Sequence, residues 1–130
     1  SMPGMMDTVL DLGLNDRSVE GLAAQTQDER FAYDSYRRLL TMFGKTVLGI
    51  DGELFEGELD ARKRARSSTS DLDLDAEDFR ELVATYKAII KDHTGEDFPL
   101  EPRKQLDMAV RAVFDSWNTE RARPQRRQRV

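Results

Sequence analysis

Residues 29–48, ERFAYDSYRRLLTMFGKTVL, carry the strongest periodic pattern in the chain. At 100° per residue, the apolar side chains that share one arc of a helix are Ala32, Tyr33, Tyr36, Leu39, Leu40 and Phe43. Val47 and Ile50 join this arc if the helix continues through Gly44, and a glycine inside a helix costs only about 1 kcal/mol. The pattern therefore predicts an amphipathic helix over residues 29–48 that packs on a core through this arc.

The segments next to this helix also carry helical signals. Before it, Asn15 and Asp16 can cap a short helix that ends near Gln25. After it, a weaker helical pattern dissolves into the basic run 62–66. The polar residues 66–74 that follow predict a mobile loop.

Two further helices are predicted in the second half of the chain. Asp75 is a favourable N-cap, and the stripe behind it consists of Phe79, Leu82, Val83, Tyr86, Ile89 and Ile90. Pro102 suits the first turn of the last helix, whose pattern ends near residues 116–118. We expect the buried face of this helix to consist of Leu106, Ala109, Val110, Val113, Phe114 and Trp117.

The N-terminal residues have a different pattern. Polar and apolar side chains alternate over Met6–Leu12, which predicts a short strand. A single strand leaves its backbone groups unpaired, so this strand suggests that the chain is cut from something larger. The turn at Pro3-Gly4 can aim backbone N–H groups at an anion, a weak signal because many turns share it.

The composition limits the classes of function. With 130 residues the chain has room for one domain core, and it has no Cys and a single His, which excludes disulfide frameworks and multi-histidine metal sites. The net charge is −5, but the five arginines of residues 121–130 make that tail positive. No run approaches the roughly 18 apolar residues of a membrane span, and no secretion signal is visible. We therefore expect an acidic protein of the cytoplasm that contacts neither a membrane nor nucleic acid.

One side chain on the long helix stands out as a candidate for anion binding. Arg38 projects opposite the core arc, on the side of Phe31 and Met42, while Arg37 lies nearer the rim of the arc. Apolar neighbours can partly desolvate an arginine and prepare it for a bidentate contact with an oxyanion. A solvated surface arginine is the simpler interpretation of the pattern alone.

Several strings resemble the pyruvate, phosphate dikinase family, specifically part of its N-terminal nucleotide-binding (ATP-grasp) region. They occur in the family's order and spacing over residues 1 to about 122. The strings are SMPGMMDTVLDLGLND, ERFAYDSYRRLL, DLDLDAEDFRELVATYKAII, GEDFPLEP and AVFDSWNTERA.

The resemblance implies a mainly α fold, with about five helices preceded by a loop and one short strand, inside a larger α+β ATP-grasp domain. Residues 1–15 would form a phosphate loop and strand, residues 16–122 a helical subdomain, and residues 123–130 a disordered or diverged basic tail. The intact enzyme would convert ATP, phosphate and pyruvate into AMP, pyrophosphate and phosphoenolpyruvate with Mg²⁺. A histidine on another domain would carry the phosphoryl group between the sites.

The family's site residues carry over onto matching positions. The residues expected beside the nucleotide phosphates are Ser1, Met2, Pro3, Gly4 and Met5, with Asp7 and Thr8 just behind them. Arg38, the second arginine of YRR, would contact a phosphate, and Arg121 would help to dock the phosphohistidine domain. No residue of the chain is expected to bind a metal.

The family's glycine-rich phosphate loop, acidic magnesium-binding strand and carrier histidine are not found in the sequence. We therefore expect the chain alone to be inactive and to bind no cofactor, and the parent enzyme to be a homodimer through another domain. Two alternatives remain open at this stage. The chain could be a stand-alone, truncated helical interaction module without catalysis, or it could bind nucleic acid through its arginine tail.

Overall fold

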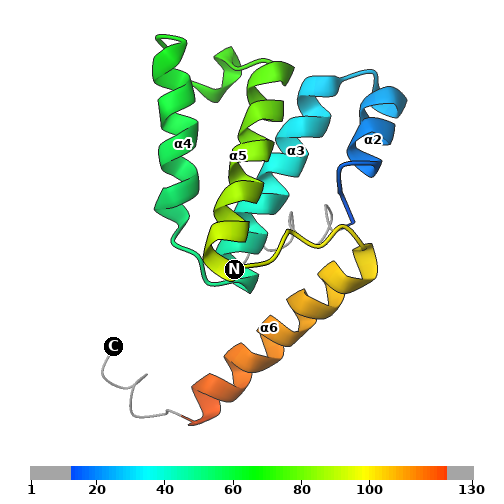
Figure 1. The fold of residues 1–130 in the computed structure, drawn as a ribbon, viewed down its shortest axis with the longest axis vertical. Helices are drawn as coiled ribbons and strands as arrows, with labels where there is room; N and C mark the ends of the chain where they lie inside the picture. Colours follow the sequence, from blue (N-terminus) through cyan, green and yellow to red (C-terminus); the bar gives the residue numbers. More distant parts are fainter. Residues whose placement is uncertain (1–12, 123–130) are drawn as a thin grey trace.

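The computed structural model describes residues 13–122, the last four of them as helical backbone only. This part of the chain is helical and contains no strand (Figure 1). Its α-helices are α2 (Ser18–Thr26), α3 (Glu29–Met42), α4 (Gly52–Ala65), α5 (Ala76–Thr94) and α6 (Pro102–Ala122). The predicted mainly helical fold is confirmed, whereas the strand predicted over Met6–Leu12 lies outside the described residues.

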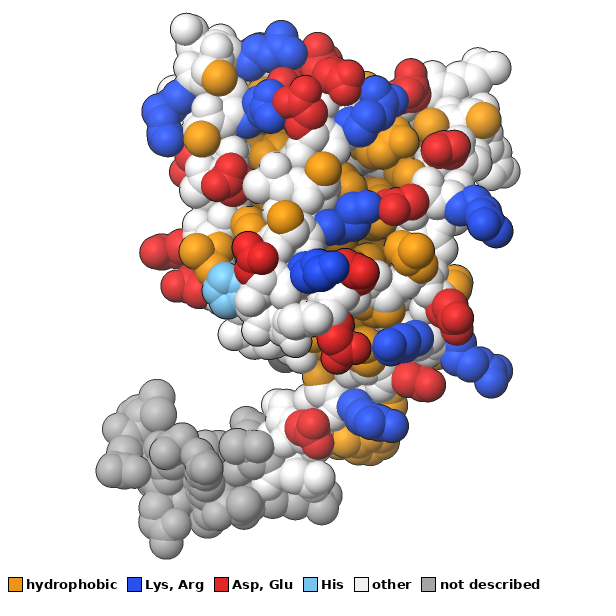
Figure 2. Space-filling model, in the orientation of Figure 1, with side chains coloured by type: hydrophobic (Ala, Val, Ile, Leu, Met, Phe, Trp, Pro, Cys, Tyr) orange, Lys and Arg blue, Asp and Glu red, His pale blue; other side chains and the backbone are white. Residues whose placement is uncertain are grey.

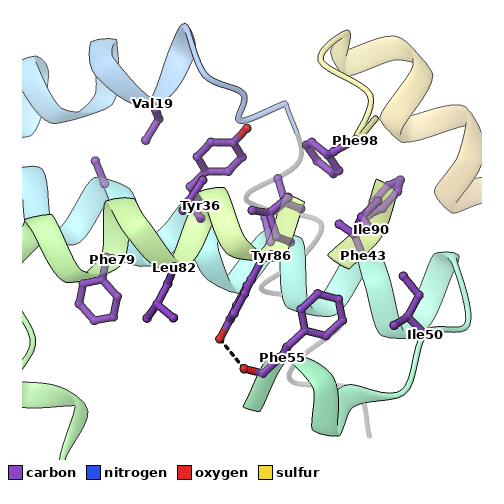
Figure 3. Packing of buried hydrophobic residues seen from close by; sticks show 14 of the residues in the cluster. Val19, Tyr36, Phe43, Ile50, Phe55, Phe79, Leu82, Tyr86, Ile90 and Phe98 are labelled. Carbon is purple, nitrogen blue, oxygen red and sulfur yellow. Dashed lines mark hydrogen bonds between the residues drawn. The ribbon is translucent and has the colours of Figure 1, made fainter. Parts of the chain in front are cut away.

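The first four of these helices form a bundle with α3 and α5 side by side at its centre (Figure 1). Helix α2 packs on α3, and α4 packs on the other side of the pair against α5. Figure 3 shows the side chains that fill the space between the helices. The fully buried residues with the largest side chains include Tyr36, Phe43, Phe55, Phe79 and Tyr86. The apolar stripes predicted for α3 and α5 therefore form the core.

Helix α3 continues past Met42 as a π-helical turn, Phe43–Val47, as the Leu48 N–H donates to the Phe43 carbonyl, five residues back, at 3.1 Å. The predicted continuation through Gly44 to about residue 48 is confirmed, but with one wider turn. Ile50, although beyond the helix, is still buried. π-Helical turns occur mostly as single insertions in α-helices.

Local capping agrees with the sequence in most places. The Asn15 side-chain oxygen accepts bonds from the N–H groups of Arg17 and Ser18 at the start of α2. Asp75 and Asp78 form a reciprocal capping box at the start of α5, and Gly95 ends that helix with φ +77°. Asp16 does not cap, because its carboxylate instead binds the Tyr36 hydroxyl and Lys87.

The loop between α4 and α5 is held more firmly than the sequence predicts. Helix α4 runs through the basic run to Ala65, and Asp71–Asp73 form a 3-10 turn. Leu74 is buried with 2% of its surface exposed. The Arg30 side chain donates to the carbonyls of Asp71 and Leu74 at 2.8 and 2.7 Å. The prediction of a mobile loop over 66–74 missed these anchors, which come from a helix far away in the sequence.

Helix α6 departs most from the prediction, because it extends away from the bundle (Figure 1). It is fixed at its first turns, where the fully buried Gln105 side chain donates to the carbonyls of Leu14 and Pro99 and accepts from the Gly13 N–H. The expected buried face is wrong for the residues that remain 44–54% exposed, which are Leu106, Val110, Phe114 and Trp117. The amphipathic pattern is real, but no element of the described chain covers this face.

Candidate functional site

Helix α3 carries a buried carboxylate, Asp34, that binds two neighbouring arginines. Asp34 Oδ1 accepts from Arg37 Nε at 3.0 Å and Nη2 at 2.6 Å, and Asp34 Oδ2 accepts from Arg38 Nη2 at 2.7 Å. These pairs have i,i+3 and i,i+4 spacing, which places their side chains on neighbouring turns of one helix face. One carboxylate therefore links a buried arginine to an exposed one.

The two arginines have different surroundings. The Arg37 side chain, at the rim of the apolar arc, is only 10% exposed, because its guanidinium lies over the Phe79 ring of α5 at 5.3 Å. The Arg38 side chain is 60% exposed, which confirms its direction away from the core. Phe31 is itself half exposed, so the expected desolvation of Arg38 by apolar neighbours is small.

Further charged side chains join this pair from α3, α4 and the loop before α5. Arg30 also lies over the Phe79 ring, at 5.1 Å, and Lys63 Nζ binds the Asp71 carboxylate at 2.8 Å. We call the whole group the arginine cluster: Arg30, Arg37, Arg38 and Lys63, with the carboxylates Asp34 and Asp71. Lys63 Nζ also lies 3.7 Å from Asp60 Oδ1, so the four cations face three carboxylates and keep a small net positive charge within an acidic chain.

The charges in the arginine cluster influence one another. The hydrogen bond from Lys63 lowers the pKa of Asp71 below its usual value, and the positive charges of Arg37 and Arg38 add to this effect. The same hydrogen bond raises the pKa of Lys63. Both groups are therefore charged at neutral pH, and the positive charges of Arg37 and Arg38 also stabilise the charged form of Asp71.

Chemically, the cluster is suited to contact an anion rather than to transfer a proton. Arginine stays protonated at all relevant pH values, and its planar fork matches the oxygens of a phosphate. Among the described residues, Arg38 makes one ion pair, through Nη2, and its side chain is 60% exposed, so the guanidinium is accessible to a further acceptor. Figure 2 shows cationic and acidic side chains interleaved over the bundle, at the end where α4 meets α5.

Other titratable side chains have structural roles. His93 lies exposed in the last turn of α5, with Nδ1 at 3.1 Å from the Ile89 carbonyl oxygen. Asp71 is bound by Lys63, and Asp75 by Arg66. Over residues 13–118, no group of three or more His, Cys, Asp or Glu side chains is arranged to hold a metal ion.

Most of the site residues inferred from the family resemblance fall outside the described part of the chain: Ser1, Met2, Pro3, Gly4, Met5, Asp7 and Thr8. The backbone of Arg121 lies in the last turn of α6, and its side chain is not among those described. That Arg38 and the Pro3-Gly4 turn lie beside the same phosphates therefore stays a prediction. Asp34 was not predicted as a site residue, although its spacing to two arginines on a helix signals an ion pair.

In the described residues, no helix combines the length and apolar character needed to cross a membrane. The fold and the cluster together define a helical subdomain that presents one exposed arginine, Arg38, beside a buried ion pair. No protein-family model matches the chain. Individual proteins do match it, over nearly its whole length.

The matching proteins are pyruvate, phosphate dikinases. The chain is 55% identical over 126 residues to pyruvate, phosphate dikinase 2 of Zea mays, a match that covers 97% of this chain. It is 57% identical over 122 residues to the chloroplastic pyruvate, phosphate dikinase 1 of Oryza sativa subsp. japonica and 54% to that of Arabidopsis thaliana. The chain spans 13–14% of the length of these relatives. The resemblance inferred from the sequence motifs is thus confirmed, for one segment of such enzymes.

Proposed function

We propose that the chain forms part of the ATP- and phosphate-binding region of a pyruvate, phosphate dikinase. The whole enzyme would convert ATP, phosphate and pyruvate into AMP, pyrophosphate and phosphoenolpyruvate, by way of a phosphohistidine on another domain. The observation that carries this proposal is the 55% identity to a relative of that name over 97% of the chain. Because the match covers 126 of the 130 residues, it includes helix α3, which presents Arg38.

In this function Arg38 contacts inorganic phosphate or the terminal phosphate of ATP. Phosphoryl transfer depends mainly on positioning and on neutralising charge, both of which an oriented guanidinium supplies. The outward position of Arg38 and its single ion pair to Asp34 support this role. The net positive charge of the arginine cluster would draw the anion toward the helix.

The remaining site assignments rest on the family resemblance. Residues 1–5 would lie beside the nucleotide phosphates with Asp7 and Thr8 behind them, and Arg121 would dock the phosphohistidine domain. Mg²⁺ does not fit the described side chains, which offer no cluster of suitable ligands, so it would be held by other parts of the enzyme. The chain alone would therefore be inactive, and the parent's homodimer contact and cytoplasmic location remain part of the proposal.

The proposal can be tested in a chimera. The matching segment of the Zea mays enzyme is replaced by this chain, and the two half-reactions are measured separately. AMP formation in a single turnover without pyruvate reports the ATP side, and exchange of label between pyruvate and phosphoenolpyruvate reports the other side. We expect the chimera to catalyse both half-reactions. A folded chimera that retains the pyruvate exchange but forms no AMP would contradict the proposed role.

Within the chimera, Arg38→Ala should slow AMP formation by about 10²-fold or more, since the lost contact neutralises charge during transfer. Exchange between pyruvate and phosphoenolpyruvate should be unchanged, because it takes place on other domains. Equal rates of AMP formation in the variant and its parent would remove Arg38 from the mechanism.

The alternative is a stand-alone helical interaction module, and the exposed apolar side chains of α6 favour it. The two functions differ in what lies beside this segment in the gene. A lysine-bearing glycine loop upstream and a histidine domain downstream support the dikinase. A stop codon directly after Val130 supports the module.

A further inference from the structure

We propose that Asp34 is a positioning residue that orients the Arg38 guanidinium for its anion. The inference rests on the proposed function, because it assumes that Arg38 contacts a phosphate. It assigns a task to a carboxylate that would otherwise oppose anion binding by its own negative charge.

The Asp34 carboxylate is itself immobilised. Its side chain is 12% exposed, and its Oδ1 accepts two hydrogen bonds from one guanidinium, that of Arg37. That guanidinium is also nearly buried and lies over the Phe79 ring. The carboxylate therefore cannot rotate without breaking a buried ion pair, which is costly.

This fixed carboxylate has one oxygen, Oδ2, left for Arg38. Asp34 Oδ2 accepts from Arg38 Nη2 at 2.7 Å, while the rest of the Arg38 side chain is largely in solvent. A free arginine side chain samples many rotamers, and holding it in one of them has an entropic cost. The bond to Asp34 supplies part of this restriction before any anion arrives, so less ordering remains for the reaction.

Asp34 has two opposite effects on the reaction at Arg38: it holds the guanidinium in one direction, and it reduces the local positive charge. Asp34 partly neutralises Arg38 and so weakens the general attraction for an anion. Replacing Asp34 by Asn would strengthen that attraction while releasing Arg38 from its fixed direction. A positioning role therefore predicts a lower rate together with an unchanged or lower KM for phosphate. General damage to the fold would instead lower the rate and raise the KM.

The test uses the chimeric dikinase and the single-turnover formation of AMP. Asp34→Asn should lower the rate by about 10-fold or more, and the KM for inorganic phosphate should stay the same or fall. Asp34→Glu, which keeps the carboxylate but moves it by one methylene, should give a rate between those of Asp34→Asn and the parent. Glu77→Gln is the matched control, because it removes an exposed i,i+3 pair with Arg80 and does not contact Arg38, so it should change neither value.

A double-mutant cycle shows whether Asp34 acts through Arg38. In the Arg38→Ala background, Asp34→Asn should cause no further loss of rate, since there is no guanidinium left to orient. The proposal would be overturned if Asp34→Asn slowed AMP formation by the same factor with and without Arg38. It would also be overturned if the Asp34→Asn enzyme kept the parent's rate. If Arg38→Ala alone leaves the rate unchanged, the role of Arg38 fails first, and with it this inference.

Thermal melting followed by circular dichroism identifies variants that fail to fold. Should Asp34→Asn lose its folded state, the same cycle is run with Asp34→Glu, which keeps the negative charge and moves the carboxylate outward. Its rate should change in the parent and not in the Arg38→Ala background. Equal rate changes in both backgrounds would overturn the positioning role.

Discussion

The Phe55 ring of α4 packs directly onto Gly44 in the π-helical turn that ends α3. A Cβ atom added at residue 44 would lie 2.5 Å from the Phe55 Cζ and 2.9 Å from its Cε2. The ring cannot easily withdraw, because Phe55 is fully buried and packs edge-on against Tyr86 with 5.1 Å between ring centroids. Gly44 thus allows α3 and α4 to approach closely at the point where the chain turns.

Gly44→Ala should lower the free energy of unfolding by about 1–3 kcal/mol, as expected for overpacking in a core. Gly57→Ala is the matched control within α4, because a Cβ at residue 57 meets no atom within 4 Å. That change should be neutral or stabilise by roughly 0.5–1 kcal/mol, since alanine favours a helix. Urea unfolding of the two variants and the parent measures the difference, and equal losses would contradict the close contact.

The two phenylalanines expected in the core should behave differently. Phe43 is fully buried, so Phe43→Ala should cost about 3–5 kcal/mol of stability. Phe114 is 53% exposed on α6, and Phe114→Ala in this chain should cost no more than about 1 kcal/mol. Thermal melting of both variants tests this. A large loss for Phe114→Ala would show that its face is covered in the folded chain.

The two arginines that bind Asp34 should contribute unequally to stability. Arg37→Met removes the buried partner of Asp34 and should destabilise the fold by about 1–3 kcal/mol, because a buried charge loses most of its hydrogen bonds. Arg38→Met removes an exposed partner and should cost less than about 1 kcal/mol. Urea midpoints provide the comparison. A reversed order would mean that the burial of the two side chains is assigned wrongly.

The ion pair between Lys63 and Asp71 should make the stability of the fold depend on pH. The pKa of Asp71 is lower in the folded chain than its ordinary value of 3.8, so its contribution is complete above pH 3.8 and is lost as the pH falls through the folded value. The pKa of Lys63 is raised above 10.5, so its contribution is complete below that pH and is lost only as the pH rises through the folded value. The pair therefore stabilises the fold across the neutral range.

Asp71→Asn should abolish this part of the acid dependence. Near pH 7 the variant should be less stable than the parent by about 1 kcal/mol or less, because the Asp71 side chain is 46% exposed. Melting temperatures measured from pH 7 down to pH 2 should converge for the two proteins at the acid end. Parallel curves over the whole range would exclude the pair as the cause.

Much of the helical fold was predictable because its signals are local. The stripe from Phe79 to Ile90 and the cap at Asp75 lie within a few turns of one another, so periodicity and capping rules identify α5 directly. The same holds for α3, whose arc of apolar side chains became the centre of the core. The family resemblance likewise required only strings of adjacent residues.

The candidate site was predictable only in part. Arg38 was placed correctly on the outer face of α3, and the spacing to Asp34 could have signalled the ion pair. Burial of Arg37 depends on Phe79, and the anchors Lys63 and Asp71 come from α4 and the following loop. Such neighbours are set by how helices distant in sequence pack, which no local pattern reports.

The amino-acid sequence alone determined which residues form helices and which face of each helix is apolar, because backbone propensity, caps and periodicity act over a few residues. Tertiary structure decided whether an apolar face is covered. The apolar stripe of α6 resembles those of α3 and α5 in sequence, yet neighbouring helices bury the stripes of α3 and α5 while most of the α6 stripe stays exposed. Burial requires a partner surface at the right place, and that is a property of the whole packed chain rather than of any segment.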